Sequence, residues 1–360
     1  MEQGSDTEAV PVRTGQLELE DAVGCSLDFD PEFRGGRLDL IGMAAQRRRS
    51  LVVGGHGSYS TAVLESVPNF SEGRDPEVIE ALRAALSDPA RLLDAHVDSD
   101  HHRSVFTLVG EDDPLVETLL RGITCARERI DLRRHDGAHP RIGAADVVPV
   151  VPLRPNQMEH ARETALTLAR RTGEELGLPV FLYGEVGTGR GPAFFRRGGP
   201  PELQRRIDAG ELRPDFGPAR LDPGAGGVIV GARRPLIAFN VNLRGDLEVA
   251  RGIAALVRES GGGFPGVRAL GLDLPRAGLV QVSMNVEDWE AAALHEIVER
   301  ITVEADARGA EVLGSELVGL MPAGAAVAAA GSVLRIDGFD ASRVLELRLL
   351  DDDSQPAVPS

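Results

Sequence analysis

The chain has 360 residues, of which 42% are hydrophobic, and its formal net charge is -17 at pH 7. This length can bury at least one full core and favours two domains, whereas apolar runs such as residues 147–153 are far shorter than the roughly 20 residues of a membrane-spanning helix, which argues against a membrane partner. The negative charge without a long basic stripe argues against nucleic acid as a partner, so small molecules are the expected substrates.

Residues 1–62 show no sustained period of 2 or 3.6 and are rich in Gly, Ser, Asp, Glu and Arg, which predicts a disordered N-terminal extension. Three arginines at 47–49 precede apolar residues 51–53, but this apolar run is too short for a twin-arginine export signal. Cys25 and Cys125 are the only cysteines, too few for a disulfide framework, and neither has a setting typical of a nucleophile. We therefore expect a cytoplasmic protein.

Regular patterning begins near Glu65 and gives a first set of elements. The periodicities predict a strand at 65–70, a helix at 76–86, strands at 92–97 and 104–109, a helix at 114–130 and a strand at 145–151. This order is β-α-β-β-α-β. Pro149 predicts that the last of these strands lies near an edge or end of its sheet, because proline cannot donate to a strand ladder.

A connecting segment and a second set of elements follow. The segment is predicted to hold a helix at 157–176, a strand at 179–183 and a loop-rich stretch to about 227, and long loops of this kind usually form lids or binding sites. The second set is predicted to comprise a strand at 236–242, a helix at 247–259, strands at 267–272 and 280–286, a helix at 289–307 and a strand at 310–318. The order of the first set is repeated.

The repeated order predicts an α+β protein made of two ferredoxin-like (βαββαβ) subdomains related by internal duplication, with an extra helix, strand and long loop between them. The predicted division is an N-terminal extension at 1–62, an N-terminal subdomain at 63–234, a C-terminal subdomain at 235–350 and an acidic tail at 351–360.

Histidines are concentrated in one part of the sequence, with five of the eight between His96 and His139. Histidine titrates near neutrality and carries a proton in both directions, so a histidine in a polar loop beside strands is a candidate acid/base residue. His139, which precedes Pro140 and Arg141, is the main candidate. The alternative is a surface histidine without a catalytic role.

A metal site is the competing interpretation of the same histidines. The possible ligands are His135, His139, Asp98, Asp100, His101 and His102. A spacing of four residues brings His135 and His139 together only on a helix, whereas the Asp-Gly at 136–137 is a turn signal and Pro140 disfavours a helical His139. We therefore expect no metal.

All 39 basic residues are arginine. The absence of lysine excludes Schiff-base chemistry and a phosphate-binding loop of the P-loop type, and it excludes a kinase despite the Asp-Phe-Gly at 215–217. The glycine-rich segment 187–191 lacks the dinucleotide-binding spacing, which argues against a nicotinamide cofactor. Arg103 and Arg141 flank the histidine cluster and could grip a substrate carboxylate, or equally pair with a nearby aspartate.

Seven segments together resemble the glutamate formimidoyltransferase family in sequence and in order. These segments are 67–73 (VPNFSEG), 102–107 (HRSVFT), 139–144 (HPRIGA), 183–185 (YGE), 214–218 (PDFGP), 238–242 (AFNVN) and 314–320 (GSELVGL). The resemblance extends from about residue 64 to residue 349. It differs at His102, where the family often has asparagine, and at Ala225, where the folate loop can hold larger residues.

The resemblance implies two α/β subdomains with a folate site between them, a homodimer, and transfer of a formimidoyl group from N-formimidoyl-L-glutamate to tetrahydrofolate as co-substrate, without a metal. It implies that His139 is catalytic and that Asn69, Asp94, Arg103 and Arg141 bind substrate. The implied folate loop consists of Gly217, Pro218, Ala219, Arg220, Leu221, Asp222, Pro223, Gly224, Ala225 and Gly226. We also expect a separate enzyme to release ammonia from the product.

Two other functions remain possible at this stage. The first is a folate-binding protein that has lost catalysis. Such a protein would not need an intact His-Pro-Arg loop, and this loop is intact here at 139–141. A metal-dependent formimidoylglutamate hydrolase would need metal and no folate.

Overall fold

The computed structural model describes residues 63–137 and 139–352. The predicted N-terminal extension, including the arginines at 47–49, and most of the predicted acidic tail lie outside the described residues. None of the helices in this part of the chain combines the length and apolar character needed to cross a membrane.

The first predicted set of elements is present, with its first strand split in two. It consists of β1 (Leu64–Ser66), β2 (Asn69–Phe70), α2 (Pro76–Ala85), β3 (Arg91–Asp98), β4 (Arg103–Gly110), α3 (Asp112–Arg129) and β5 (Ala145–Pro152). In the sheet, β4 lies between β3 and the β1 and β2 strands, and β5 pairs with β1 and β2 on their other side. Asp75 starts α2, because its carboxylate accepts the first free N–H groups of the helix.

The connecting segment extends this sheet. It contains α4 (Met158–Glu175), β6 (Val180–Gly184), α5 (Pro192–Arg196), α6 (Gly199–Asp208) and β7 (Val228–Ala232). Strand β7 pairs in parallel with both β5 and β6. The predicted loop-rich stretch to about residue 227 contains two helices, α5 and α6, that were not predicted, because glycine and proline interrupt their short apolar faces.

The second predicted set forms a separate antiparallel sheet with the order β11-β8-β10-β9. Its elements are β8 (Ile237–Arg244), α7 (Leu247–Val257), β9 (Val267–Leu274), β10 (Leu279–Val286), α8 (Leu294–Asp306) and β11 (Glu311–Val318), followed by α9 (Ala323–Leu334) and α10 (Leu345–Asp352). Helix α8 begins later than predicted because the chain first makes a turn in which Ala292 N–H donates to Asp288 O. Helices α9 and α10 were not predicted. Two sheets with helices confirm the α+β class.

Strand β5 is internal, so the prediction of an edge position from Pro149 is wrong. It pairs with β1 and β2 on one side and with β7 on the other. Pro149 lies opposite the break between β1 and β2, since Val150 pairs with Ser66 and Val147 with Asn69, and its carbonyl accepts from Ser66 Oγ at 2.6 Å. The missing proline N–H therefore falls at a break rather than within a continuous ladder.

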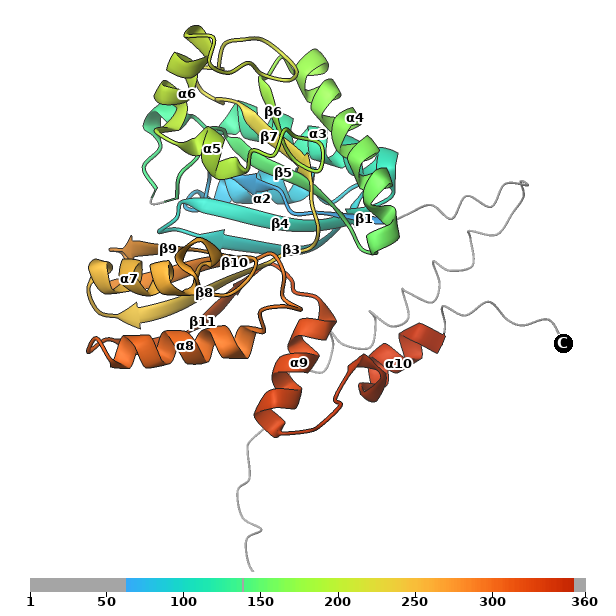
Figure 1. Cartoon of the computed structure of the whole chain (residues 1–360). Coiled ribbons are helices and arrows are strands. Elements are labelled where there is room, and N and C mark those ends of the chain that lie inside the picture. Colours follow the sequence, from blue (N-terminus) through green and yellow to red (C-terminus); the bar gives the residue numbers. More distant parts are fainter. Residues whose placement is uncertain (1–62, 138, 353–360) are drawn as a thin grey trace, which may run out of the picture. The chain divides into compact units, whose positions relative to one another are not determined.

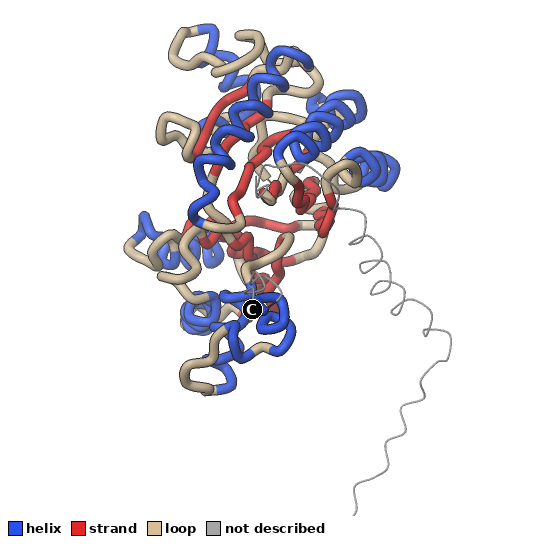
Figure 2. The backbone as a smooth tube through the Cα atoms, turned by 90° about the vertical axis from the view of Figure 1, so that its right-hand side faces the viewer, coloured by secondary structure: helices blue, strands red, loops and turns tan. Residues whose placement is uncertain are grey.

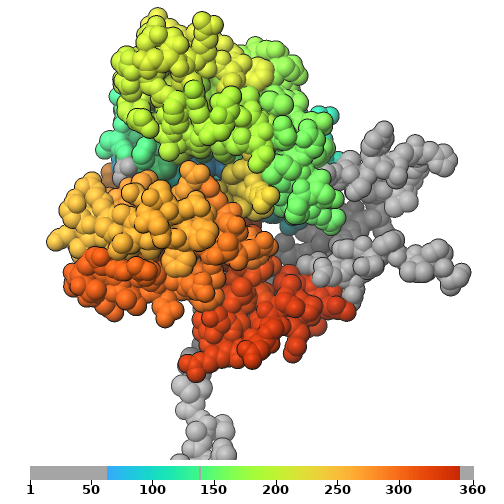
Figure 3. Space-filling view, in the orientation of Figure 1, coloured from blue at the N-terminus to red at the C-terminus, as the bar shows by residue number. Residues whose placement is uncertain are grey.

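Helices cover the faces of the sheets unequally (Figures 1 and 2). Helices α2, α3 and α4 bury the main core against the first sheet, and α5 and α6 pack on its other face beside β6 and β7. Helices α7 and α8 bury one face of the second sheet, and they form much of the surface on the side seen in Figure 3. The second face of β3 and β4 thus carries no helix of its own.

That helix-free face of β3 and β4 is polar because side chains alternate along a strand. Phe106 points into the main core, so its neighbours on either side point the other way, as do Asp98 and His96 of β3. His96 meets Glu316 of β11 at 3.3 Å. Contacts of this kind bring polar strands of the two sheets together beside the loop that carries His139.

Candidate active site

His139 lies in the loop between the short 3-10 helix η2 (Leu132–Arg134) and β5, and a buried carboxylate fixes this loop. Asp146 Oδ1 accepts the N–H of Ile142 at 2.6 Å and that of Gly143 at 3.3 Å. The other oxygen, Oδ2, accepts from Arg196 Nε at 2.8 Å and pairs with Arg196 Nη2 at 2.5 Å. One side chain therefore sets the path of the histidine loop and holds an arginine next to it.

Arg141 uses its N–H groups on main-chain carbonyls of the same region. It donates to His139 O and His101 O, each at 2.8 Å from Nη2, and to His102 O at 2.9 Å from Nη1. Nη1 also lies 2.6 Å from His135 Nε2, which must be the acceptor because a guanidinium has no lone pair to offer. These contacts occupy the donors that a substrate carboxylate would need, so Arg141 is placed to shape the loop.

Arg103 is differently placed, with donors still available. Its Nη1 lies 3.4 Å from Asn69 Oδ1, which brings two of the expected substrate-binding residues together. Its Nε is buried without a hydrogen-bond partner among the described residues. Burial, and next the charge of Arg196, lower the pKa of Arg103 to about 10, so the guanidinium is still positive at neutral pH and can bind an anion.

The surroundings of His139 keep its imidazole neutral. Burial lowers the pKa of His139 well below the ordinary value of 6.5, and the charges of Arg103, Arg196 and Arg141 act in the same direction. A neutral imidazole at physiological pH is ready to accept a proton. The site is therefore a base enclosed by arginines, which suits an anionic substrate that must lose a proton.

Asp94, the remaining expected substrate-binding residue, lies on β3 and is half-buried. Among the described residues its carboxylate has no hydrogen-bond or ion-pair partner, so it is available to a ligand. It shares its strand face with His96 and Asp98, where the two sheets meet.

His102 and His135 form a second histidine pair, with ring centroids 4.0 Å apart. His102 has a φ of 49°, in the left-handed region that asparagine adopts most readily among side-chain-bearing residues. Its Nδ1 accepts the N–H of Gly73 at 3.2 Å. This backbone conformation suits asparagine, because an asparagine oxygen can occupy the place of Nδ1.

We expect His102→Asn to leave the free energy of unfolding unchanged within about 0.5 kcal/mol, since the new side chain suits the backbone and keeps an acceptor for Gly73 N–H. His102→Ala should lower it by about 1–2 kcal/mol, because alanine is strained in the left-handed region and leaves Gly73 N–H with Glu72 Oε1, at 2.8 Å, as its one acceptor among the described residues. Urea denaturation followed by circular dichroism measures both. Equal stability of the alanine and asparagine variants would contradict this account.

The expected folate loop is partly exposed and partly fastened. Residues 217–220 are exposed, whereas Asp222 Oδ1 accepts the N–H groups of Gly224 and Ala225, each at 2.9 Å. Gly227 N–H donates to Ile142 O at 3.0 Å, so this loop runs directly beside the His139 loop. The Ala225 side chain is buried in the main core, and its size therefore affects core packing rather than contact with a ligand.

A three-residue group with metal-ligand chemistry joins the two sheets. Atoms of His96, Asp98 and Glu316 lie within 4.8 Å of one another. The group does not fit a metal site well, because Arg103 already interacts electrostatically with both carboxylates and would repel a second cation. Of the ligands considered from the sequence, only Asp98 belongs to this group.

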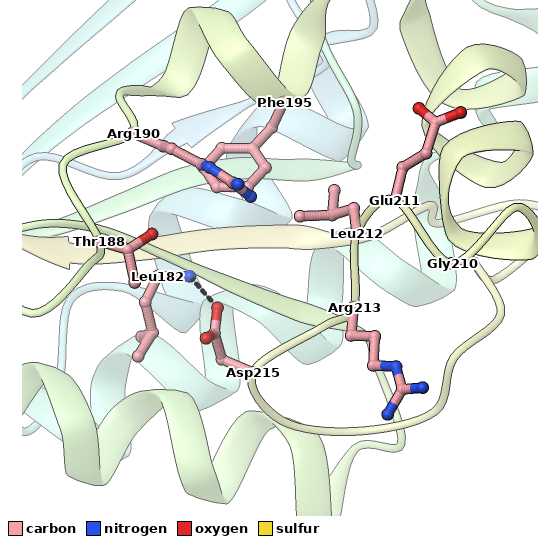
Figure 4. Close-up of a pocket in the computed structure, with 9 residues that line it drawn as sticks. All are labelled: Leu182, Thr188, Arg190, Phe195, Gly210, Glu211, Leu212, Arg213 and Asp215. Carbon is pink, nitrogen blue, oxygen red and sulfur yellow. Dashed lines mark hydrogen bonds between the residues drawn. The ribbon is translucent and has the colours of Figure 1, made fainter.

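A hollow of about 420 Å³ lies near β6, α5 and residues 210–215 (Figure 4). Its lining contains no histidine. Asp215 points to the main chain of β6, where its Oδ2 accepts the N–H of Leu182 at 2.8 Å, and Phe216 O accepts the N–H of Val180 at 2.9 Å. The Asp-Phe-Gly segment therefore has a structural role at the start of the expected folate loop.

Two residues of the site were missed from the sequence. Asp146 could have been found, because a charged residue at the start of a run of apolar strand residues must be paired if it is buried. Arg196 gave no local signal, since it follows two phenylalanines in a glycine-rich stretch far from the histidines.

Comparisons with known proteins identify the family of the chain. Residues 63–233 match a family described as the N-terminal subdomain of the formiminotransferase domain, and residues 238–339 match the formiminotransferase domain. Glutamate formimidoyltransferase of Streptococcus pyogenes serotype M1 is 40% identical over 295 residues, covering 80% of this chain and 99% of the relative. The protein of the same name from Thermoplasma acidophilum is 38% identical over 300 residues, covering 80% and 97%. Formimidoyltransferase-cyclodeaminase of Sus scrofa is 41% identical over 272 residues, which cover 72% of this chain and 50% of that relative.

Proposed function

The chain belongs to the formiminotransferase domain family, and from this membership we propose that it is a glutamate formimidoyltransferase. The proposed reaction moves the formimidoyl group from N-formimidoyl-L-glutamate to N5 of tetrahydrofolate, as a step that joins histidine degradation to one-carbon metabolism. The structural observation that supports the proposal is the position of His139 next to Arg103, Arg141 and Arg196, whose charges, together with burial, lower the pKa of its imidazole.

The chemistry requires one proton to move between two nitrogens. A bond forms between N5 and the amidine carbon, and the bond between that carbon and the glutamate nitrogen breaks. His139 takes the proton that leaves N5 and gives it to the departing glutamate nitrogen, so the enzyme ends as it began. General acid/base help of this kind contributes roughly 10²- to 10⁴-fold, and the remainder comes from holding both substrates together.

The charged residues around His139 would hold the first substrate. Arg103, which has free donors, and Arg196, which is aligned by Asp146, would bind the glutamate carboxylates. Asp94, which has no partner among the described residues, would face the cationic amidine. Asn69 would contribute through Arg103, and Arg141 would act by shaping the loop.

Tetrahydrofolate, the second substrate, would bind along the loop from Gly217 to Gly226. What supports this position is the hydrogen bond between the adjoining Gly227 and Ile142, which keeps the loop beside His139. Residues 217–220 are exposed and could contact the pterin or its glutamate tail.

The proposed architecture is two ferredoxin-like subdomains related by internal duplication, with boundaries at 63–234 and 235–350. It is supported by the same neighbour pattern in both sheets: the first and third strands of each set pair centrally, the second lies beside the third, and the fourth beside the first. We also propose a cytoplasmic homodimer. The family resemblance supports the dimer, and the free thiol of Cys125, whose pKa is raised by burial, is compatible with a reducing compartment.

One assay tests the proposed activity. The protein is incubated with formimidoylglutamate, with and without tetrahydrofolate and with and without a chelator, and glutamate release is followed. We expect release only with tetrahydrofolate, unaffected by chelator. Release without tetrahydrofolate that stops with chelator would instead identify a metal-dependent hydrolase, and folate binding without release would identify a binding protein.

A further inference from the structure

His101 is nearly fully buried although it lies in the turn between β3 and β4, with 1% of its surface exposed. Asp98 holds it at two points. Asp98 Oδ1 accepts the main-chain N–H of His101 at 2.8 Å, and Oδ2 accepts a hydrogen bond from Nδ1 of the ring. Because a carboxylate is only an acceptor, Nδ1 carries a proton, and in the form of the ring that holds this one proton Nε2 keeps a lone pair.

Asp98 is ionised at neutral pH. Its burial acts to raise its pKa, but the side-chain and main-chain hydrogen bonds from His101 lower that pKa to about 2. The carboxylate is thus a permanent negative charge behind the His101 ring.

The other ring nitrogen of His101, Nε2, makes no hydrogen bond to the described residues, although it is buried. Buried polar atoms are almost always paired, so an unpaired one calls for a functional explanation. The ring of His139 lies beside it, with centroids 6.2 Å apart and planes at 71°. Arg141 donates to the main-chain carbonyls of both histidines and so fastens their loops to each other.

The charges around His139 show that its protonated form needs a compensating negative charge. His139 must carry a positive charge between its two proton transfers, yet Arg103, Arg196 and Arg141 all oppose that charge. A protonated His101 would oppose it too, so His101 can help only in the form whose Nε2 is free to accept. Asp146, the carboxylate of this region, is already paired with Arg196. Asp98, acting through His101, is a negative charge that can compensate.

Resting on the proposed transferase activity, we propose that Asp98, His101 and His139 form a relay in which His101 is a positioning residue that supports the protonated form of His139. When His139 takes the proton from N5, its other ring N–H donates to His101 Nε2, while His101 Nδ1–H donates to Asp98. The proton then leaves His139 for the departing glutamate nitrogen. Both rings then hold the protons with which they began, and no other reactant is needed.

Two substitutions separate the relay from a structural role. His101→Asn keeps a donor for Asp98 in the place of Nδ1 and removes Nε2, so we expect kcat to fall about 10- to 100-fold, as for the loss of a hydrogen bond to a charged group, with the KM for formimidoylglutamate unchanged. His101→Gln places an amide oxygen near the position of Nε2 and should restore part of that loss. His160→Asn is the matched control, because His160 pairs with Asp112 at 2.6 Å on the helical side of the first sheet, and it should turn over like the parent.

The direction of a pKa change provides a readout that does not depend on activity. NMR titration of the His139 ring in the substrate-free protein should show a lower pKa in His101→Asn than in the parent, since the protonated ring has lost its acceptor. A raised pKa would mean that His101 is a cation repelling His139, and an unchanged pKa with parental kcat would mean that His101 is structural; either result overturns the relay. If the parent shows no transfer at all, the proposed function fails, while this titration still decides whether the histidines are coupled.

Discussion

His139→Asn is expected to lower kcat by about 10²- to 10⁴-fold, because the variant has no group that can take the N5 proton and return it to the glutamate nitrogen. Asparagine fits the half-buried position, and the loop remains held by Asp146 and Arg141, so folding and folate binding should be retained. Steady-state kinetics with both substrates, a folate titration and circular dichroism measure the three properties. His295→Asn on α8 is the control and should be fully active. Parental turnover in a folded, folate-binding His139→Asn protein would refute the assignment.

The pH dependence of kcat/KM in the parent enzyme should show that the surroundings of His139 lower its pKa. A base acts only when unprotonated, and burial together with the three arginines lowers the pKa of His139. The value of kcat/KM should therefore stay level as the pH falls through 6.5 and decline only at lower pH. Bound glutamate carboxylates would partly neutralise the arginines, so the acid limb of kcat should lie at higher pH than that of kcat/KM. An acid limb of kcat/KM at or above 6.5 would contradict this environment.

The sequence was sufficient for the order of the main elements because their periodicities are long and clear. It failed at α5 and α6, where glycine and proline hide two short helices whose apolar residues, such as Phe195 and Leu203, are recognisable only from what they pack against. It also misplaced β5, because the rule that proline occurs in edge strands assumes that the neighbouring strand is continuous. The break between β1 and β2 is a tertiary feature that no local pattern reveals.

The candidate site was also predictable only in part, because local residue types can be recognised in the sequence and long-range contacts cannot. Residue type and loop context pointed to His139, and chemistry alone suggested arginines for a carboxylate. Whether an arginine is free depends on long-range contacts: Arg141 is occupied by carbonyls up to 40 residues away, whereas Arg103 keeps an unpaired Nε. Arg196 reaches the site over 50 residues of chain from Asp146, which sequence spacing could not anticipate.

Asp146→Ala is expected to reduce the free energy of unfolding by about 3–5 kcal/mol, the cost of breaking a buried ion pair from one side. The side chains of Arg196 and Asp146 are 15% and 5% exposed, so water cannot replace the lost carboxylate easily. The N–H of Ile142 would also lose its acceptor. Urea denaturation followed by circular dichroism measures the loss.

Asp146→Asn separates the two functions of this carboxylate. Its amide oxygen can still accept the N–H of Ile142, so the histidine loop should keep its path and the loss of stability should be smaller than for alanine. Arg196, however, loses its counter-charge and its alignment beside His139, so kcat/KM should fall even where the protein is folded. Glu202→Gln, which removes an exposed partner of Arg205, is the matched control and should change neither stability nor activity, because exposed ion pairs contribute little. If Asp146→Asn had the stability and the kcat/KM of the parent, the Asp146 carboxylate would not be what holds the histidine loop and Arg196. The proposed mechanism would then need another group that keeps Arg196 next to His139.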